Sequence, residues 1–372
     1  MQSAKNLYTD SSQLLSQLDY CIKYYIFNKL VNVLLCVACK NDSQQFENDT
    51  IPFPNTIELT GINTGPKNYF ASPIECISSG SDLLVFDTGK DFYFHLLDES
   101  LKIKQTLLKK GHGPGEMDNE PMLSHHDFNR LGGIYYYDFV RSSIVKLPVS
   151  NDGSYDDHSP EEIHIPEELY NLQSVTILED SIFVGNGGMA EGKLFFFFPG
   201  TRENVIKTPF IPPPSRNNDR EYMMYSYLGK VTWDPKSKST YFANSYFPQI
   251  EVYGDNYEIN NIVTTDKHAA LGREKMFYYH GIEYGLQKVF ALYLGENSDN
   301  LLKNLFGDFK SKLHVFDKDG NPLLEIKLDR LLTSFTLDVR NGRIIGIDEG
   351  NEEQPLVEYT LPNQLLNLNE MN

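Results

Sequence analysis

The feature that most constrains the fold is a pair of β-rich runs that recurs along the chain. Each copy consists of a first β-rich run, a turn and a second β-rich run. In most copies the first run ends on Asp or Asn. The six copies are Leu83–Asp87 with Phe92–Leu97, Gly133–Asp138 with Ser143–Leu147, Ser181–Asn186 with Lys193–Phe198, Thr240–Asn244 with Gln249–Tyr253, Lys288–Tyr293 with Lys312–Phe316, and Gly342–Asp348 with Pro355–Tyr359. Their spacing of about 50 residues matches one propeller blade of four antiparallel strands.

This repeat predicts an all-β fold, a six-bladed β-propeller of four-stranded antiparallel blades. β-Sandwiches also contain many short strands, but a sustained period of this length favours radial repetition. The composition agrees, because 23 Tyr and 23 Phe favour strands while 26 Gly and 19 Pro supply turns. One helix is expected inside the fifth unit, over Ser298–Phe309, where leucines keep helical spacing.

A propeller ring must close, because an open array would expose sheet edges. The first and last blades should therefore touch, and the ends of the ring should lie close together. We expect Thr56–Leu59 to complete the last blade beside Leu356–Thr360. The closed ring is expected to be a monomer.

The first forty residues have the pattern of an export signal. A basic stretch over Lys23–Lys29 precedes the short apolar run Leu30–Ala38, which is too short to span a bilayer. The end of that run, Cys36-Val-Ala-Cys39, resembles a bacterial lipobox, and this resemblance implies that Cys39 is lipidated. Cys36 stands where such signals usually have Leu. The alternative is an ordinary apolar segment with two chance cysteines.

The expected organisation follows from this signal. Residues 1–38 form the signal region, 39–56 a lipid-anchored polar tether, 57–362 the propeller and 363–372 a C-terminal tail. Asp10 and Asp19 are unusual ahead of a signal core. We therefore expect translation to start downstream of Met1, near Ile22. Cys76 is the one cysteine of the propeller, so neither a disulfide framework nor a cysteine-based zinc site is expected there.

The net charge excludes one class of partner. A formal charge of −18 repels phosphate backbones, and the sequence shows no basic patch that would offset it. Nucleic-acid binding is not expected. The acidity also has a simpler role in keeping the protein soluble.

One loop suggests a family. Lys110-Gly-His-Gly-Pro-Gly-Glu116 resembles the Gly-x-Gly-Pro-Gly-Glu element of the TolB-like six-bladed propeller lipoproteins. The stretches Lys312–Gly320 and Gly342–Asp348 also resemble the final blades of that family. The resemblance covers roughly residues 57–362. It implies a six-bladed propeller, usually exported and lipid-anchored, and it supplies no catalytic residues.

Three motifs invite a chemical interpretation, and each also has a structural one. The glycine-rich loop could bind phosphate, but Pro114 removes a donor and no helix follows, which favours a tight turn between blades. His125 and His126, with His112 nearby, could bind a metal, but adjacent strand residues point to opposite faces. Asp317–Gly320 begins like a calcium loop yet lacks the closing Glu, which favours a hairpin turn.

Recognisable catalytic signatures are missing from the sequence. No Gly-x-Ser-x-Gly elbow is present, nor is the Asp-box of sialidases, and the single Trp233 is interpreted as packing at the end of a strand. A lactonase-type site of scattered acidic and amide ligands remains compatible with the sequence.

Polar residues recur where the first run of several units ends. If these positions are equivalent, their side chains ring one mouth of the channel and form a candidate ligand-binding site. The simpler interpretation is that each bonds its own backbone as a turn former. The five candidates are Asp87, Asp138, Asn186, Asn244 and Asp348.

The expected function is therefore that of an exported, lipid-anchored binding or scaffold module of the cell envelope. One face of the propeller would contact an envelope protein or a glycan, since rigid blades carry variable loops. No cofactor is expected. The alternative is a hydrolase or lactonase with an acidic, calcium-dependent site at the mouth of the channel.

Overall fold

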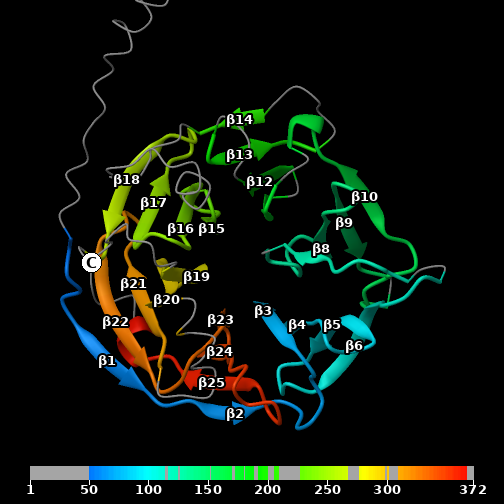
Figure 1. Cartoon of the computed structure of the whole chain (residues 1–372), viewed down its shortest axis with the longest axis horizontal. Coiled ribbons are helices and arrows are strands. Elements are labelled where there is room, and N and C mark those ends of the chain that lie inside the picture. Colours follow the sequence, from blue (N-terminus) through cyan, green and yellow to red (C-terminus); the bar gives the residue numbers. More distant parts are fainter. Residues whose placement is uncertain are drawn as a thin grey trace, which may run out of the picture. The chain divides into compact units, whose positions relative to one another are not determined.

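The structure is a computed structural model that describes residues 50–366, except 114–115, 125, 151, 170–171, 180, 188–191, 200–204, 209–226, 267–275, 298–299 and 301–308. Six sheets follow one another around a central axis, so the six-bladed propeller is confirmed (Figure 1). The signal region and Cys39 lie outside the described residues, as does most of the predicted helix Ser298–Phe309. Within the described part, no helix has the length and apolar character needed to cross a membrane.

In the first five blades the four blade strands follow one another in sequence order, and in all six blades the repeated pairs of runs are the second and third strands. The first three blades contain β3 (Pro73–Ser79), β4 (Asp82–Asp87), β5 (Phe92–Leu97) and β6 (Ile103–Lys109); β7 (Met122–Leu123), β8 (Gly133–Asp138), β9 (Ser143–Pro148) and β10 (Glu161–His164); and β11 (Ser174–Glu179), β12 (Ile182–Asn186), β13 (Leu194–Phe197) and β14 (Val205–Lys207).

The other three blades complete the ring. They contain β15 (Gly229–Asp234), β16 (Ser239–Asn244), β17 (Gln249–Tyr253) and β18 (Ile259–Thr264); β19 (Met276–Gly285), β20 (Lys288–Asn297), β21 (Lys312–Phe316) and β22 (Pro322–Leu328); and β23 (Ser334–Asp338), β24 (Arg343–Ile347) and β25 (Leu356–Thr360). The N-terminal strands are β1 (Thr56–Leu59) and β2 (Ile62–Thr64). A 3-10 turn η1 (Glu167–Leu169) and the short helix α4 (Asn363–Leu366) are also described.

The middle strands of a blade are buried on both faces because each blade packs between two neighbours. All residues of β4 and β8 are buried. Phe94 of the first blade packs against Tyr136 of the second with ring centroids 5.8 Å apart. Comparable clusters lie between every pair of neighbouring blades, including Ile345 of the sixth blade with Val85 of the first. The core is therefore a ring of interfaces between blades.

The N-terminal segment closes the ring, but not as the sequence suggested. β2 pairs antiparallel with β25 and becomes the fourth strand of the sixth blade, whereas β1 pairs parallel with β22 as a fifth strand of the fifth blade. Figure 1 shows both strands on the outer rim, beside β22 and β25. The expectation that Thr56–Leu59 lies beside Leu356–Thr360 is therefore wrong.

Side chains explain this placement of the N-terminal segment. Ile57 and Leu59 pack on the apolar cluster that lies between the fifth and sixth blades. The bend at Gly61 is held by Asp329, whose Oδ1 accepts the Gly61 N–H at 3.2 Å, and by Arg330, which donates to the Gly61 carbonyl at 3.1 Å. A Cβ at Gly61 would lie 2.4 Å from Val357, so the close approach of the chain to the sixth blade at this position requires glycine.

Candidate functional site

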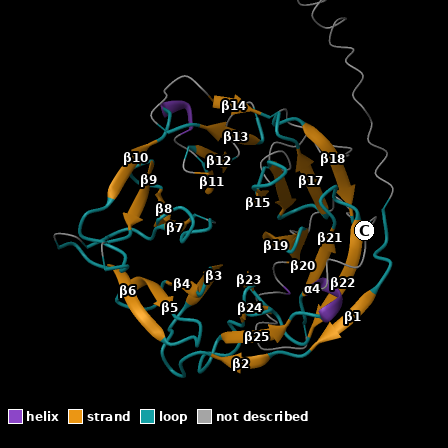
Figure 2. Cartoon of the chain, turned by 180° about the vertical axis from the view of Figure 1, so that it is seen from behind, coloured by secondary structure: helices purple, strands orange, loops and turns teal. Residues whose placement is uncertain are grey.

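The six innermost strands enclose a small cavity on the propeller axis. Strands β3, β7, β11, β15, β19 and β23 each contribute to its lining, so all six blades meet there. Figure 2 shows these strands facing the centre of the ring. The cavity volume is about 30 Å³, which is room for one group of the size of a water molecule.

Three ionisable side chains enter this cavity. Glu75 comes from β3, Lys230 from β15 and His280 from β19, and together we call them the axial cluster. Lys230 Nζ lies 3.0 Å from Glu75 Oε1, with the two side chains 40% and 19% exposed. Because the first and fourth blades stand opposite each other in a six-membered ring, this ion pair crosses the axis.

His280 is exposed to the cavity, yet the surrounding strands replace most of the bulk water around it. This desolvation, reinforced by the charge of Lys230 and opposed by that of Glu75, lowers the pKa of His280 to about 4. The imidazole is therefore neutral at pH 7, with one nitrogen donating and the other accepting hydrogen bonds. The axial cluster then carries no net charge.

The inner strands that hold the axial cluster are fixed by side chains from neighbouring blades. Thr232 Oγ1 of β15 accepts the N–H of Tyr284 in β19 at 3.0 Å, and Glu283 of β19 accepts the N–H of Leu337 in β23 at 2.6 Å. Thr336 of β23 continues the series by accepting a backbone N–H of β3 at 2.8 Å. These bonds satisfy backbone donors at the inner edges of the sheets, which have no further strand to pair with, so the axial cluster stands on a rigid frame.

The five strand-end candidates occupy equivalent positions, but their polar atoms serve the backbone. Four of them end the second strand of a blade, and Asp348 directly follows β24. Asp87 accepts three backbone N–H groups, those of Ala71, Ser72 and Gly89, at 2.7 to 2.9 Å.

Of the other four candidates, three form similar turns and Asn186 bonds neighbouring strands. Asp138 Oδ1 accepts the N–H groups of Val140 and Arg141, each at 3.0 Å. Asn244 Oδ1 accepts those of Tyr246 and Phe247 at 2.8 and 3.0 Å. Asn186 accepts the Ser174 hydroxyl and donates to the Gly229 carbonyl at 2.8 Å, which ties the third blade to the fourth. Asp348 accepts the Gly350 N–H at 3.1 Å.

Burial raises the pKa of the Asp348 carboxyl, while Arg330, whose Nη1 lies 3.6 Å from Oδ2, opposes the rise. None of the five candidates is among the residues that line the axial cavity. In the described ranges no three His, Cys, Asp or Glu side chains are grouped as metal ligands. Ligand binding by the five residues stays a prediction.

The glycine-rich loop forms a turn between the first two blades. The Glu116 carboxylate accepts the Gly113 N–H at 2.9 Å and pairs with Lys109 at 2.6 Å, and these contacts lower the pKa of Glu116. Gly111 has a φ of +148°, and a Cβ there would lie 2.1 Å from Glu116 Oε2. The glycines thus make room for the carboxylate. Pro114 lies outside the described residues.

The other motifs also take structural roles. His126 is buried, with Nε2 accepting the Tyr135 N–H at 3.0 Å, while His112 lies 3.1 Å from Asp118 at the exposed surface and His125 lies outside the described residues. Asp317 accepts the N–H groups of Asp319 and Asn321 at 2.9 and 2.8 Å, as expected of a hairpin turn.

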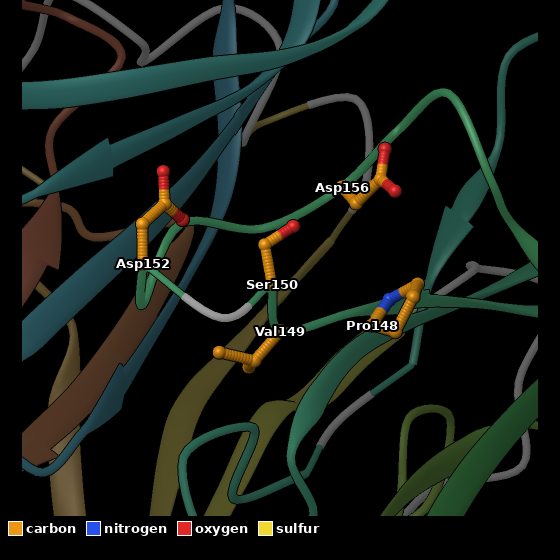
Figure 3. Close-up of a pocket in the computed structure, with 5 residues that line it drawn as sticks. All are labelled: Pro148, Val149, Ser150, Asp152 and Asp156. Atoms are coloured by element: carbon orange, nitrogen blue, oxygen red, sulfur yellow. The ribbon is translucent and has the colours of Figure 1, made fainter.

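A second cavity lies on the surface of the second blade. Figure 3 shows its lining by Pro148, Val149, Ser150, Asp152 and Asp156. Asp152 bonds the hydroxyl and N–H of Ser154, and Asp156 bonds the His158 N–H at 2.8 Å. Both carboxylates are therefore turn formers of an exposed loop.

The axial cluster was not predicted from the sequence. Its residues stand on the innermost strands, whereas the recognisable runs are the second and third strands. A charged residue inside an apolar strand, as in Pro73-Ile-Glu-Cys-Ile77, is the signal that could have found Glu75. A buried ion pair between Lys193 and Glu251 was not predicted either. Each side chain is 1% exposed, and the pair joins the third and fourth blades.

Comparisons with known proteins agree with this architecture. No protein-family model and no curated protein matches the chain. Among solved structures, a member of the DUF4221 family from Bacteroides vulgatus is 12% identical with a TM-score of 0.53, covering 84% of this chain and 98% of that one. A protein described as exported, from Bacteroides fragilis, is 12% identical with a TM-score of 0.49, covering 84% and 99%. A luciferin-regenerating enzyme is 11% identical with a TM-score of 0.48, covering 81% and 95%. At such identity, the likeness to the DUF4221 structure shows the propeller fold alone.

Proposed function

We propose that this chain is a non-enzymatic binding or scaffold module, exported and anchored to the cell envelope through a lipid on Cys39. The observation that supports the binding role is that strand-end side chains accept hydrogen bonds from the backbone of the turns that follow them. Asp87, Asp138 and Asn244 direct their oxygens to their own turns, which stiffens the loops of one face. Stiff loops on a rigid frame suit the recognition of a partner.

Export and anchoring rest on the sequence. The order of basic stretch, apolar run and Cys36-Val-Ala-Cys39 supports a lipoprotein signal. The resemblance of the glycine-rich loop to TolB-like lipoproteins supports the same location. We assign the chain to the periplasm-facing or outer surface of a bacterial envelope on these grounds.

The face that contacts the partner is assigned from exposed apolar residues. Phe139 and Val140 are 48% and 65% exposed in the turn between β8 and β9. Turns between second and third strands lie on the face where the inner strands begin. Ser174 and Ser334, the first residues of β11 and β23, line the axial cavity near that same face. We call it the entrance face.

A cross-linking experiment tests this assignment. A photo-reactive amino acid replaces Val140 on the entrance face, or Val339, which is 40% exposed in the β23–β24 turn on the opposite face. The proposal predicts that an envelope protein or glycan is captured in living cells through position 140 and not through 339. Equal capture at both positions, or none at either, contradicts the proposal.

The hydrolase alternative needs carboxylates that are free to bind a cation. The oxygens reported above for Asp87 and Asp138 are engaged with backbone donors instead. This observation favours the binding module over the calcium-dependent enzyme.

A further inference from the structure

The axial cluster has hydrogen-bonding capacity that its internal contacts do not use. An ammonium group has three N–H donors. Among the described residues, the Lys230 ammonium donates one hydrogen bond, to Glu75 Oε1 at 3.0 Å. The Lys230 side chain is 40% exposed, in a cavity that it lines. At least part of its donor capacity is therefore open to a group that enters the channel.

Glu75 and His280 add the complementary capacity. Glu75 Oε2 can accept hydrogen bonds beside the bonded Oε1, and the neutral imidazole of His280 can both donate and accept. His280 is exposed to the cavity. Donors and acceptors thus converge on one small space.

The charge balance selects the chemistry of the entering group. Lys230 and Glu75 cancel each other and His280 is neutral, so the cluster has no net charge at pH 7. An added carboxylate or ammonium group would leave one unpaired charge in this confined space, which is costly. A hydroxyl group carries no charge and can donate to Glu75 while it accepts from Lys230.

The size and walls of the cavity agree with a hydroxyl group at the end of a larger molecule. A volume of about 30 Å³ takes one hydroxyl-sized group and no complete sugar ring. Val231, Ile282 and Phe335 supply apolar parts of the lining. The hydroxyl-bearing residues Ser174, Thr176 and Ser334 line the same space.

We propose that Glu75, Lys230 and His280 bind a hydroxyl group of a neutral saccharide that reaches into the axial channel from the entrance face. This inference rests on the proposed binding function and gives the class of its ligand. The sugar would lie across the mouth of the channel, with one hydroxyl group inserted between the three side chains.

The test uses the full-length protein in detergent and isothermal titration with four trisaccharides. Maltotriose, chitotriose and mannotriose are neutral probes, and trigalacturonate is the acidic probe. We expect at least one neutral saccharide to bind and trigalacturonate to bind at least tenfold more weakly. Glu75→Gln and Lys230→Met should each weaken the neutral ligand at least tenfold.

Two further variants keep the test decisive. His280→Asn changes a cavity side chain outside the ion pair and should weaken binding even if the ion-pair variants fail to fold. Lys327→Met removes an exposed lysine of β22 and should leave binding unchanged. Unchanged affinity in Lys230→Met and His280→Asn would place the saccharide elsewhere, which overturns this inference but not the binding function. Preference for trigalacturonate, or binding of no saccharide, also overturns it, while the cross-linking experiment decides the binding function separately.

Discussion

Lys230 Nζ in β15 lies 3.0 Å from Glu75 Oε1 in β3, and this ion pair spans the axis of the propeller between opposite blades. The apolar clusters among the described residues lie between neighbouring blades, whereas this pair directly connects strands on opposite sides of the ring. The pair joins two opposite inner strands and also forms the centre of the proposed ligand site.

A double-mutant cycle measures the strength of this ion pair. Lys230→Met, Glu75→Gln and the double variant should give a coupling energy of about 1 kcal/mol in urea unfolding, because the pair is partly exposed and partly screened. Lys327→Met, at an exposed position of β22, should change the free energy of unfolding by less than about 0.5 kcal/mol. A coupling energy indistinguishable from zero would show that the pair does not brace the channel.

Gly111→Ala should destabilise the turn between the first two blades. The added Cβ would meet the Glu116 carboxylate at 2.1 Å and would also occupy a φ of +148°. The comparison variant is Gly132→Ala, where φ is +61° and no atom lies within 4 Å of the added Cβ. Thermal melting should show the larger loss for Gly111→Ala. An equal or smaller loss for Gly111→Ala would contradict the crowding of this turn.

Acid should destabilise the fifth blade through His314. This side chain is buried, with Nδ1 3.1 Å from the Tyr279 hydroxyl and its ring stacked on Tyr293, and Lys312 and Glu325 lie beside it. Burial lowers the pKa of His314 to about 4 despite the opposing charge of Glu325. An unfolded chain protonates histidine near pH 6.5.

The sign follows from these two pKa values. Between about pH 6.5 and 4 the unfolded state binds the proton and the folded state does not, so the free energy of unfolding falls as pH falls. One such proton gives a slope of at most about 1.4 kcal/mol per pH unit. His280 acts in the same direction. Urea unfolding between pH 7 and 4.5 should show a shallower slope in His314→Gln, and an unchanged slope would rule out this role.

The N-terminus provides a separate prediction. Residues 1–38 should be absent from the mature protein, and Cys39 should carry a lipid, because the apolar run ends on Cys36-Val-Ala-Cys39. Intact mass of the protein from the membrane fraction checks both points. Cys39→Ser should leave the signal uncleaved. An unmodified N-terminus at or before Lys23 contradicts the prediction.

The sequence was a good guide to the blades and a poor one to their centre. Runs such as Gly133–Asp138 are recognisable because a strand buried between two blades is apolar on both faces. The strand that closes the sixth blade was predicted at Thr56–Leu59 instead of Ile62–Thr64, because both runs are short and apolar in part. The bend at Gly61, which lies against Val357, places the second run beside the sixth blade.

The pairing within the axial cluster could not be predicted from the sequence for a different reason. Glu75 and Lys230 are separated by 155 positions, and nothing in either strand indicates that the other faces it across the ring. The recurrence of Asp87 and Asp138 at strand ends was visible in the sequence, and the turn-forming interpretation matches their bonds to backbone N–H groups.

The central claim is that this propeller is a binding module whose strand-end carboxylates hold turns. A melting curve with and without calcium, on the wild type and on Asp138→Asn, tests it most directly, since a cation bound only by the folded state raises the melting temperature. The account predicts no calcium-dependent rise for either protein, with a lower melting temperature for Asp138→Asn because its turn loses the charge that accepts the Val140 and Arg141 N–H groups. A calcium-dependent rise in the wild type that Asp138→Asn abolishes would contradict the account and favour a metal-assisted enzyme.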